Sequence, residues 1–454
     1  MPGQGPTQER ARREHRRVAL GTLVGTTIEW YDFFIYANAA ALVLTPMFFE
    51  PFVASYGELA GRLVSFATVG VSFIFRPLGA VVAGHFGDKL GRKAMLVLTL
   101  LLMGASTTLI GLVPGYAAIG VWAPVLLILL RVLQGFSAGG EWGGAALMAV
   151  EHAPANRRGR YGGFPQIGVP VGMLIATAVL SVVTATTTEQ QFLDWGWRVP
   201  FLLSVVLIVV GMVIRLGIAE SPVFSGEGER ERVRLPLVQM FRFNGKQVVQ
   251  GTLTFAANNA AGYMVTGGYV LSYTTSVLGM ERSTILNLVT LTSAAWVVTT
   301  MSAAVLSDRI GRTAVYKIGF LTLLVWVFPM FWLVDTEDPV LLAVALLVFS
   351  VGIGFTYGPQ AAMLAEMFPA QVRYSGAGLS YAFGAVLGGA FAPMIATWLQ
   401  AAFGSSMAVS GYLFALAAIG LVATFTIKDR TGGPLGADAL DIPGAAELSA
   451  AARR

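Results

Sequence analysis

The sequence predicts an all-α polytopic membrane protein, with twelve transmembrane helices in two six-helix bundles related by a pseudo-two-fold axis along the membrane normal. Three observations lead to this prediction. Of 454 residues, 55% are hydrophobic and 12% are charged, a balance too apolar for a water-soluble surface. The apolar runs are long and continuous, whereas barrel strands alternate over about ten residues. Two short motifs also recur, in the same order, in both halves of the chain.

Each predicted helix is an apolar run long enough to cross a hydrocarbon core of about 30 Å, which takes roughly 20 residues. In chain order, we expect these helices at 18–47, 62–84, 93–113, 121–149, 160–184, 197–218, 248–278, 285–307, 314–334, 339–364, 373–400 and 406–428. The first run is too long for a signal peptide and contains acidic residues, so we interpret it as a spanning helix.

The basic residues set the expected topology. With the amino terminus in the cytoplasm, most of the 30 Lys and Arg fall on the cytoplasmic side, as the positive-inside rule requires. The predicted parts are a basic arm at 1–17, a first bundle at 18–218, a cytoplasmic linker at 219–247, a second bundle at 248–428 and a mobile cytoplasmic tail at 429–454. We therefore expect a multi-pass protein of the cell membrane with both termini in the cytoplasm.

Composition also excludes several kinds of site. The chain has no cysteine and three histidines far apart, so we expect no disulfide, no metal centre and no cofactor. The net charge of +5 comes from short basic clusters between apolar runs. Such clusters suit lipid headgroups better than nucleic acid, so we expect membrane lipids and no nucleic acid among the partners. We also expect a small-molecule substrate, and a chain that is active as a monomer.

Two motifs recur 215 to 220 residues apart. GHFGDKLGRK at 84–93 has a partial copy, AVLSDRIGRT, at 304–313, and EHAPANRR at 151–158 matches EMFPAQVR at 366–373. Each pair occupies equivalent positions between predicted helices. This indicates a parallel repeat of six helices, which is the arrangement expected of a rocker-type transporter with its site between the two halves.

These motifs, with RVLQGFSAGG at 131–140, resemble the major facilitator superfamily along nearly the whole chain. EWYDFFIY at 29–36, FRPLGA at 75–80 and QGFSAGGEWGG at 134–144 are similar to its metabolite:proton symporter branch, whose members carry organic acids or betaine-like osmolytes. The resemblance implies cytoplasmic ion-pair networks that hold the outward-open state. Their residues would be Asp88, Arg92, Glu151, Arg158, Asp308, Arg312, Glu366 and Arg373. Plain topogenic charge is the alternative.

The first predicted helix carries buried acids. Glu29, Asp32 and Tyr36 share one face near mid-membrane, where a carboxylate costs roughly 2.5 to 3.5 kcal/mol and so needs a partner or a watery cavity. Proton coupling through Asp32 and Glu29 is one interpretation, and a structural ion pair is the other. Arg131 is the expected partner of Asp32, and the resemblance implies such a pair. An arginine released by protonation of Asp32 would bind a substrate carboxylate in a two-pronged manner.

Further polar residues are candidates for contact with substrate. Arg131 and Gln134 lie on one stripe, and Arg76 would either bind an anion or pair with Glu29 or Glu141. Other polar side chains in the predicted helices are Tyr36, Asn258, Asn259 and Tyr263, with Gln166, Tyr357, Gln360 and Tyr381 as weaker candidates. Mutual hydrogen bonding between helices is the alternative for the asparagines.

The function that these observations favour is secondary active transport, with proton symport of a small organic acid by alternating access. Uptake of a zwitterion such as betaine or proline remains open, because aromatic residues near the first-helix acids suit a quaternary amine. Drug or metabolite efflux is less favoured. A membrane enzyme is disfavoured because the sequence has no G-x-S-x-G, H-E-x-x-H or phosphate-loop motif.

Overall fold

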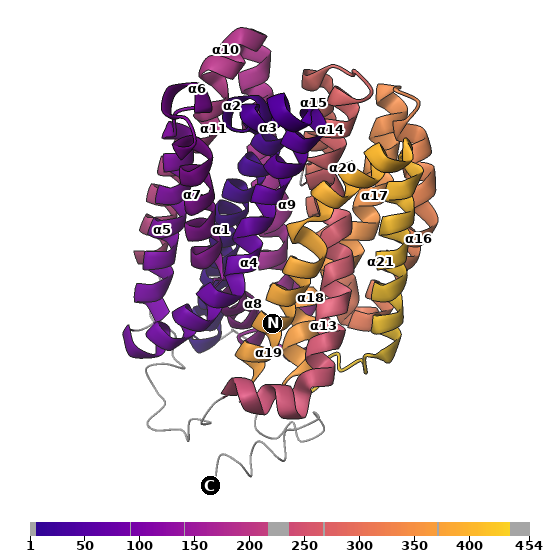
Figure 1. Cartoon of the computed structure of the whole chain (residues 1–454). Helices are drawn as coiled ribbons and strands as arrows, with labels where there is room; N and C mark the ends of the chain where they lie inside the picture. Colours follow the sequence, from indigo (N-terminus) through magenta and orange to yellow (C-terminus); the bar gives the residue numbers. More distant parts are fainter. Residues whose placement is uncertain are drawn as a thin grey trace.

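The computed structural model describes residues 6–90, 92–139, 141–216, 236–266, 268–369 and 372–435, and side chains within 18–82, 97–139, 141–213, 240–262, 268–369 and 372–435. Two bundles stand side by side, the first drawn in indigo to magenta and the second in rose through orange to yellow (Figure 1). Within the described residues, nine helical segments are long and apolar enough to cross a membrane. The structure thus has the predicted all-α fold.

The first bundle contains the helices up to residue 216. Its spanning segments and short connecting helices are α1 (Pro6–Leu42), α2 (Leu44–Phe48), α3 (Glu50–Tyr56), α4 (Glu58–Leu90), α5 (Arg92–Leu112), α6 (Tyr116–Ile119), α7 (Trp122–Ala138), α8 (Glu141–Glu151), η1 (Ala155–Arg157), α9 (Arg158–Thr186), α10 (Glu189–Asp194), η2 (Gly196–Arg198) and α11 (Val199–Leu216). The helix α1 therefore extends through much of the segment expected as a basic arm.

The second bundle repeats this plan. Its elements are α13 (Pro236–Thr266), α14 (Tyr269–Ser276), α15 (Arg282–Ile310), α16 (Arg312–Val334), α17 (Pro339–Tyr357), α18 (Gln360–Met367), α19 (Arg373–Gly384), the π-helical η3 (Ala385–Ala390), α20 (Ala392–Phe403) and α21 (Met407–Thr426). The helix α13 begins inside the expected linker and kinks at Asn244, whose φ of −124° is not helical.

Small residues bring the helices close together. In α7, a Cβ atom added to Gly135 would lie 1.9 Å from the carbonyl oxygen of Ser72 in α4, so only glycine allows this approach. In α9, a Cβ atom on Gly163 would lie 2.7 Å from the side chain of Ala304 in α15. The second contact joins the two bundles, and the candidate site lies in the same interface.

Candidate functional site

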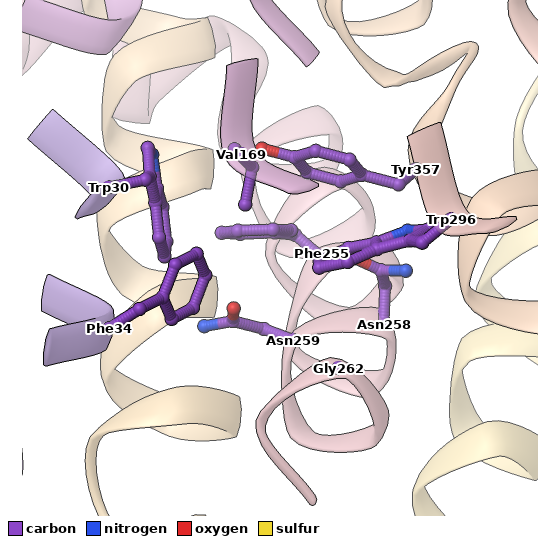
Figure 2. Close-up of a pocket in the computed structure, with 9 residues that line it drawn as sticks. All are labelled: Trp30, Phe34, Val169, Phe255, Asn258, Asn259, Gly262, Trp296 and Tyr357. Carbon is purple, nitrogen blue, oxygen red and sulfur yellow. The ribbon is translucent and has the colours of Figure 1, made fainter. Parts of the chain in front are cut away.

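A small cavity lies between the bundles. Its volume is about 10 Å³, which is room for about one water molecule. The lining combines aromatic rings, amides and small residues from both bundles: Trp30, Phe34, Val169, Phe255, Asn258, Asn259, Gly262, Trp296 and Tyr357. Figure 2 shows Trp30 and Phe34 facing Phe255 and Asn259 across this space. The space is too small for a metabolite, so the bundles have to separate before one can bind there.

A buried ion pair lies behind the Trp30 wall of the cavity. Arg76 of α4 places its Nη2 atom 3.4 Å from Oε1 of Glu29 in α1, and the two residues are 2% and 1% exposed. The Arg76 guanidinium also lies 5.1 Å from the ring centroid of Trp30, 4.3 Å from that of Phe33 and 4.6 Å from that of Phe73. The side chain of Trp30 thus joins this charge pair to the cavity. Of the two partners proposed for Arg76, the structure gives Glu29.

Asp32 and Arg131 were expected to pair with each other, but each has other hydrogen-bond partners in the structure. Oδ1 of Asp32 accepts a hydrogen bond from Ser204 of α11 at 2.8 Å. Arg131 of α7 donates to the backbone carbonyls of Thr68 and Val69 and to the hydroxyl of Ser72, all in α4. The two residues are still close enough for a favourable charge interaction. Both are fully buried.

Gln134 and Tyr36 complete a polar cluster around Arg131. Nη1 of Arg131 donates to Oε1 of Gln134 at 2.7 Å, and Nε2 of Gln134 donates to Thr107 at 2.6 Å. The centroid of the Tyr36 ring lies 3.9 Å from the guanidinium carbon, and the Tyr36 hydroxyl donates to Oγ1 of Thr68, which itself donates to the carbonyl of Ser65. This cluster lies within the first bundle and contributes none of the nine cavity-lining residues.

The asparagines expected in the second bundle do line the cavity. Asn258 donates from Nδ2 to the carbonyl of Ile353 and to Oγ1 of Thr356, at 3.1 and 2.6 Å. Asn259 donates to the carbonyl of Ala385 at 3.4 Å. Their amide oxygens are the polar groups that α13 brings to the cavity, as Figure 2 shows. The side chain of Tyr263 lies outside the described residues.

Aromatic stacking across the bundle interface was not anticipated from the sequence. Trp142 of α8 stacks on Tyr381 of α19, with ring centroids 3.8 Å apart and planes 9° apart. Tyr381 in turn stacks on Phe255 at 4.2 Å, and Phe255 lines the cavity. Gln166 of α9 bonds to both Trp142 and the carbonyl of Tyr357. The sequence pattern does not distinguish rings at the bundle interface from other rings of a spanning helix, because an aromatic residue in such a helix is usually part of the core.

Charged side chains join the bundles at the lower end of Figure 1, where α8 ends and α9 and α19 begin. We call this group the charged network: Glu151, Arg158, Asp308, Arg312, Glu366 and Arg373. Within the second bundle, Arg312 binds both carboxylate oxygens of Glu366 at 3.2 Å and Oδ1 of Asp308 at 2.7 Å.

Three contacts of the charged network cross between the bundles. Arg373 lies 3.0 Å from Glu151, and Arg158 lies 3.7 Å from Glu366. The carboxylate of Asp308 accepts hydrogen bonds from the backbone N–H groups of Gly159 and Arg160, at 2.7 and 2.8 Å. Asp308 therefore caps the first turn of α9, where a negative charge is favourable. The side chains of the remaining motif residues, Asp88 and Arg92, lie outside the described residues.

The segment that follows α21 covers the charged network. We call residues 429–435 the strap. Arg158 donates to the carbonyl of Gly433, and Arg373 donates to the carbonyl of Leu435. Asp429 accepts hydrogen bonds from the N–H and hydroxyl of Thr313, both at 2.9 Å, and from Thr431. Burial raises the pKa of Asp429, but these hydrogen bonds outweigh it and hold the pKa below its ordinary value.

The comparisons with known proteins agree with this architecture. The sequence profile of the Major Facilitator Superfamily matches residues 23–393. The chain belongs to this superfamily. It is 40% identical to the inner membrane metabolite transport protein YhjE of Escherichia coli K12, over 90% of this chain and 92% of that protein. It is 39% identical to the shikimate transporter of the same organism, over 91% of this chain and 94% of that protein.

Other relatives widen the range of cargoes. A putative proline/betaine transporter of Staphylococcus aureus COL is 33% identical, over 93% of this chain and 90% of that protein. Among solved structures, the proton:xylose symporter XylE bound to 6-bromo-6-deoxy-D-glucose covers 93% of this chain and 98% of its own, with a TM-score of 0.75 and 17% identity. The structural likeness shows the fold alone. Within this superfamily, the chain is a multi-pass membrane transporter of metabolites and not an enzyme.

Proposed function

We propose that this transporter takes up a small organic acid together with protons. The observation that carries the proposal is the buried pair of Glu29 and Arg76 behind Trp30 at the cavity wall. An ion pair buried inside a membrane bundle is costly to keep, and such residues commonly mark ion or substrate pathways. The pair combines an acid that can accept a proton with an arginine that can bind a carboxylate.

The chemistry follows from exchange of partners at Arg76. When Glu29 takes up a proton, its attraction for Arg76 falls, and the planar guanidinium becomes available to a substrate carboxylate. Nε of Arg76 has no hydrogen-bond partner within the described residues, so a second donor is ready for a two-pronged contact. When the substrate leaves, the ion pair re-forms and releases the proton. Asn258 and Asn259 would hold other polar groups of the cargo.

Asp32 is the second acid of the proposed pathway, less than one helical turn from Glu29. It lies among Ser204, Arg131 and the first-helix rings, and it is fully buried. We assign Arg131, Gln134 and Tyr36 to the support of this acid. The anion-binding role expected for Arg131 passes to Arg76, because Arg131 already donates to four acceptors.

The charged network is the proposed cytoplasmic gate. Its contacts between the bundles would have to break before the cavity opens at that end. This assignment places both termini in the cytoplasm and the protein in the cell membrane, in agreement with the positive-inside pattern. Residues 1–5 and 436–454 lie outside the described residues.

Uptake into proteoliposomes with an imposed pH gradient tests the proposal. We expect the wild type to accumulate labelled shikimate-like acids or dicarboxylates when the outside is acidic. Glu29→Gln should remove pH-driven accumulation, and Arg76→Lys should raise the substrate concentration needed for half-maximal uptake at least about tenfold. A tenfold change corresponds to about 1.4 kcal/mol.

Glu58→Gln is the matched control, since Glu58 is an exposed acid at the start of α4 that makes no ion pair with another residue that the structure describes. It should transport like the wild type. Accumulation by Glu29→Gln at the wild-type level would overturn the coupling role of Glu29. Accumulation that appears only with the gradient reversed would instead support efflux.

Uptake of a zwitterion is the second candidate, and the cavity itself favours it. None of the nine residues that line it is charged, and five are aromatic. Aromatic faces attract quaternary ammonium groups. Labelled glycine betaine belongs in the same assay, and accumulation of betaine that survives Arg76→Lys would favour this alternative over an organic acid.

A further inference from the structure

A long apolar groove runs between α13 and α21, on the outside of the second bundle. It has a volume of about 600 Å³ and is lined by Gly245, Lys246, Val249, Gln250, Leu253, Ala418, Ile419, Val422, Ala423 and Thr426. Val249, Ile419 and Val422 are 57%, 45% and 64% exposed. In a spanning bundle this surface faces the acyl chains of the bilayer.

The groove has a floor that holds its two walls together. Nε2 of Gln250 in α13 donates to the carbonyl and the hydroxyl of Thr426 in α21, at 2.9 and 2.8 Å. The last turn of α21 is therefore tied to α13 near the end where α13 begins. The groove is open along the rest of its length because Gly245, Ala418 and Ala423 are small.

Positive charge gathers at the same end of the groove. Lys246 is part of the lining, Arg242 lies two residues before the kink at Asn244, and Lys428 follows Thr426 by two residues. All three side chains are exposed. None of them makes an ion pair with another residue that the structure describes. The end of an apolar groove thus carries cations that no acidic side chain of the described residues neutralises.

The kink in α13 places this end of the groove at the membrane surface. Beyond the break at Asn244, the first part of α13 runs across the lower end of the bundle instead of along it (Figure 1). Phe241 on this part is 50% exposed, while Met240 is fully buried against the protein. An exposed aromatic ring beside basic residues is the pattern of a helix that lies in the headgroup region.

We propose that this groove is a binding site for one anionic phospholipid. The phosphate would lie between Lys246, Lys428 and Arg242, and one acyl chain would follow Val249, Leu253 and Ile419 along the bundle. Basic pockets between transmembrane helices hold anionic headgroups in this manner, and each basic residue near the surface contributes about fivefold in affinity. A zwitterionic lipid fits the apolar part equally well but gains less from the three cations, because its ammonium group offsets the charge of its phosphate.

Native mass spectrometry after reconstitution in equal amounts of phosphatidylglycerol and phosphatidylcholine tests the site. We expect the wild type to retain phosphatidylglycerol in preference to phosphatidylcholine. Lys246→Gln with Lys428→Gln should reduce that preference at least about fivefold, and Lys246→Arg with Lys428→Arg should keep it. Val249→Trp, which fills the groove and keeps the charges, should reduce retention of both lipids at this site.

Arg309→Gln is the matched control, because Arg309 is an exposed basic residue of α15 that does not line the groove. It should leave the preference unchanged. Equal retention of the two lipids by the wild type would overturn the proposal. So would an equal loss in the Arg309 variant, full retention in Val249→Trp, or a second protein copy bound in place of lipid. An unchanged unfolding temperature shows that each variant is folded.

Discussion

Two arginines in the first bundle differ in how their hydrogen-bond donors are used. The guanidinium of Arg131 donates hydrogen bonds to two carbonyls and a hydroxyl of α4 and to Gln134. The guanidinium of Arg76 instead faces one carboxylate and three aromatic rings. A guanidinium with all its donors in use contributes to stability, because moving it away from these acceptors inside a bundle would leave buried N–H groups without partners. Arg76 has fewer hydrogen bonds to lose when it changes its partner.

We expect Arg131→Lys to lower stability more than transport. A lysine carries a point charge and cannot reach four acceptors from one planar fork, so the loss should be about 1.5 to 3 kcal/mol in the free energy of unfolding. Thermal unfolding in detergent, followed by tryptophan fluorescence, measures it. Arg309→Lys on the exposed surface should melt with the wild type. An unchanged melting temperature for Arg131→Lys would contradict the structural assignment.

The second residue-scale prediction concerns pH and Asp429. Its pKa is held below the ordinary value by hydrogen bonds from Thr431 and Thr313, against the effect of burial. A depressed pKa in the folded state means that the carboxylate stabilises the strap above the pKa of the unfolded chain, and that this contribution is lost as the pH falls through the folded pKa.

Asp429→Asn should therefore melt below the wild type at neutral pH, and the two curves should converge in acid. Unfolding temperatures across a pH series measure the difference. Glu281→Gln is a useful comparison, because hydrogen bonds from Ser283 and Thr284 lower the pKa of Glu281 as well. Its unfolding temperature should differ from that of the wild type in the same pH-dependent way. A gap between wild type and Asp429→Asn that stayed constant with pH would refute the assignment.

At the scale of elements, glycine sets how closely α7 can approach α4. The backbone of Gly135 lies against that of Ser72, one turn from the carbonyls that Arg131 binds. The short distance between α7 and α4 therefore allows both the backbone contact at Gly135 and the hydrogen bonds that Arg131 makes with α4. Separation of these helices by a methyl group would stretch the hydrogen bonds of Arg131 as well.

We expect Gly135→Ala to destabilise the protein by about 1 to 3 kcal/mol, the usual cost of overpacking. Gly411→Ala is the matched control in α21, where an added Cβ meets nothing within 4 Å. That variant should be as stable as the wild type or slightly more so, because alanine favours helix. Equal unfolding temperatures for the two variants would show that α7 moves away from α4 without cost.

Most elements could be predicted from the sequence because a spanning helix must be a long apolar run. The kink at Asn244 falls in the polar stretch RFNGKQ at 242–247, which belongs to the expected linker. The π-helical turn at Ala385–Ala390 could not be predicted, because it lies inside a continuous apolar stretch. It coincides with contacts to other helices, such as Gly388 against the backbone of Ala256. Such contacts join distant parts of the chain and leave no local pattern.

At the scale of the whole molecule, the charged network and the cavity are the two ends of one interface between the bundles. Asp308 contributes most directly to the closure, because its carboxylate binds Arg312 in its own bundle and two N–H groups of α9 in the other. Loss of its charge should favour states in which this end is open.

We expect Asp308→Asn to raise the accessibility of the cavity from the cytoplasmic side about tenfold, equivalent to about 1.4 kcal/mol. The chain has no cysteine, so Gly262→Cys places a single thiol at the cavity, in a position with free space. Its alkylation rate in inside-out vesicles is the measurement. Asp335→Asn is the control, since Asp335 joins Tyr273 to Ser406 within one bundle. Equal rates in both variants would contradict the role of Asp308.

The sequence predicted the fold and the meeting of the repeated motifs more fully than it predicted the site. Repeated spacing brought Glu151, Asp308 and Glu366 to one end, because the two halves of the chain have the same architecture. The partners of buried acids depend instead on helix rotation and tilt. Rotation of a helix by a fraction of a turn decides whether Glu29 or Asp32 faces a given arginine. The hydropathy of the sequence does not depend on this rotation and so cannot predict it.

The small size of the cavity has a consequence for the kinetics of the carrier. The cavity has room for about one water molecule, so the two bundles have to separate before a metabolite can lie between them. Substrate binding is therefore coupled to a movement of whole helices, which takes on the order of microseconds to milliseconds, and does not depend on diffusion alone.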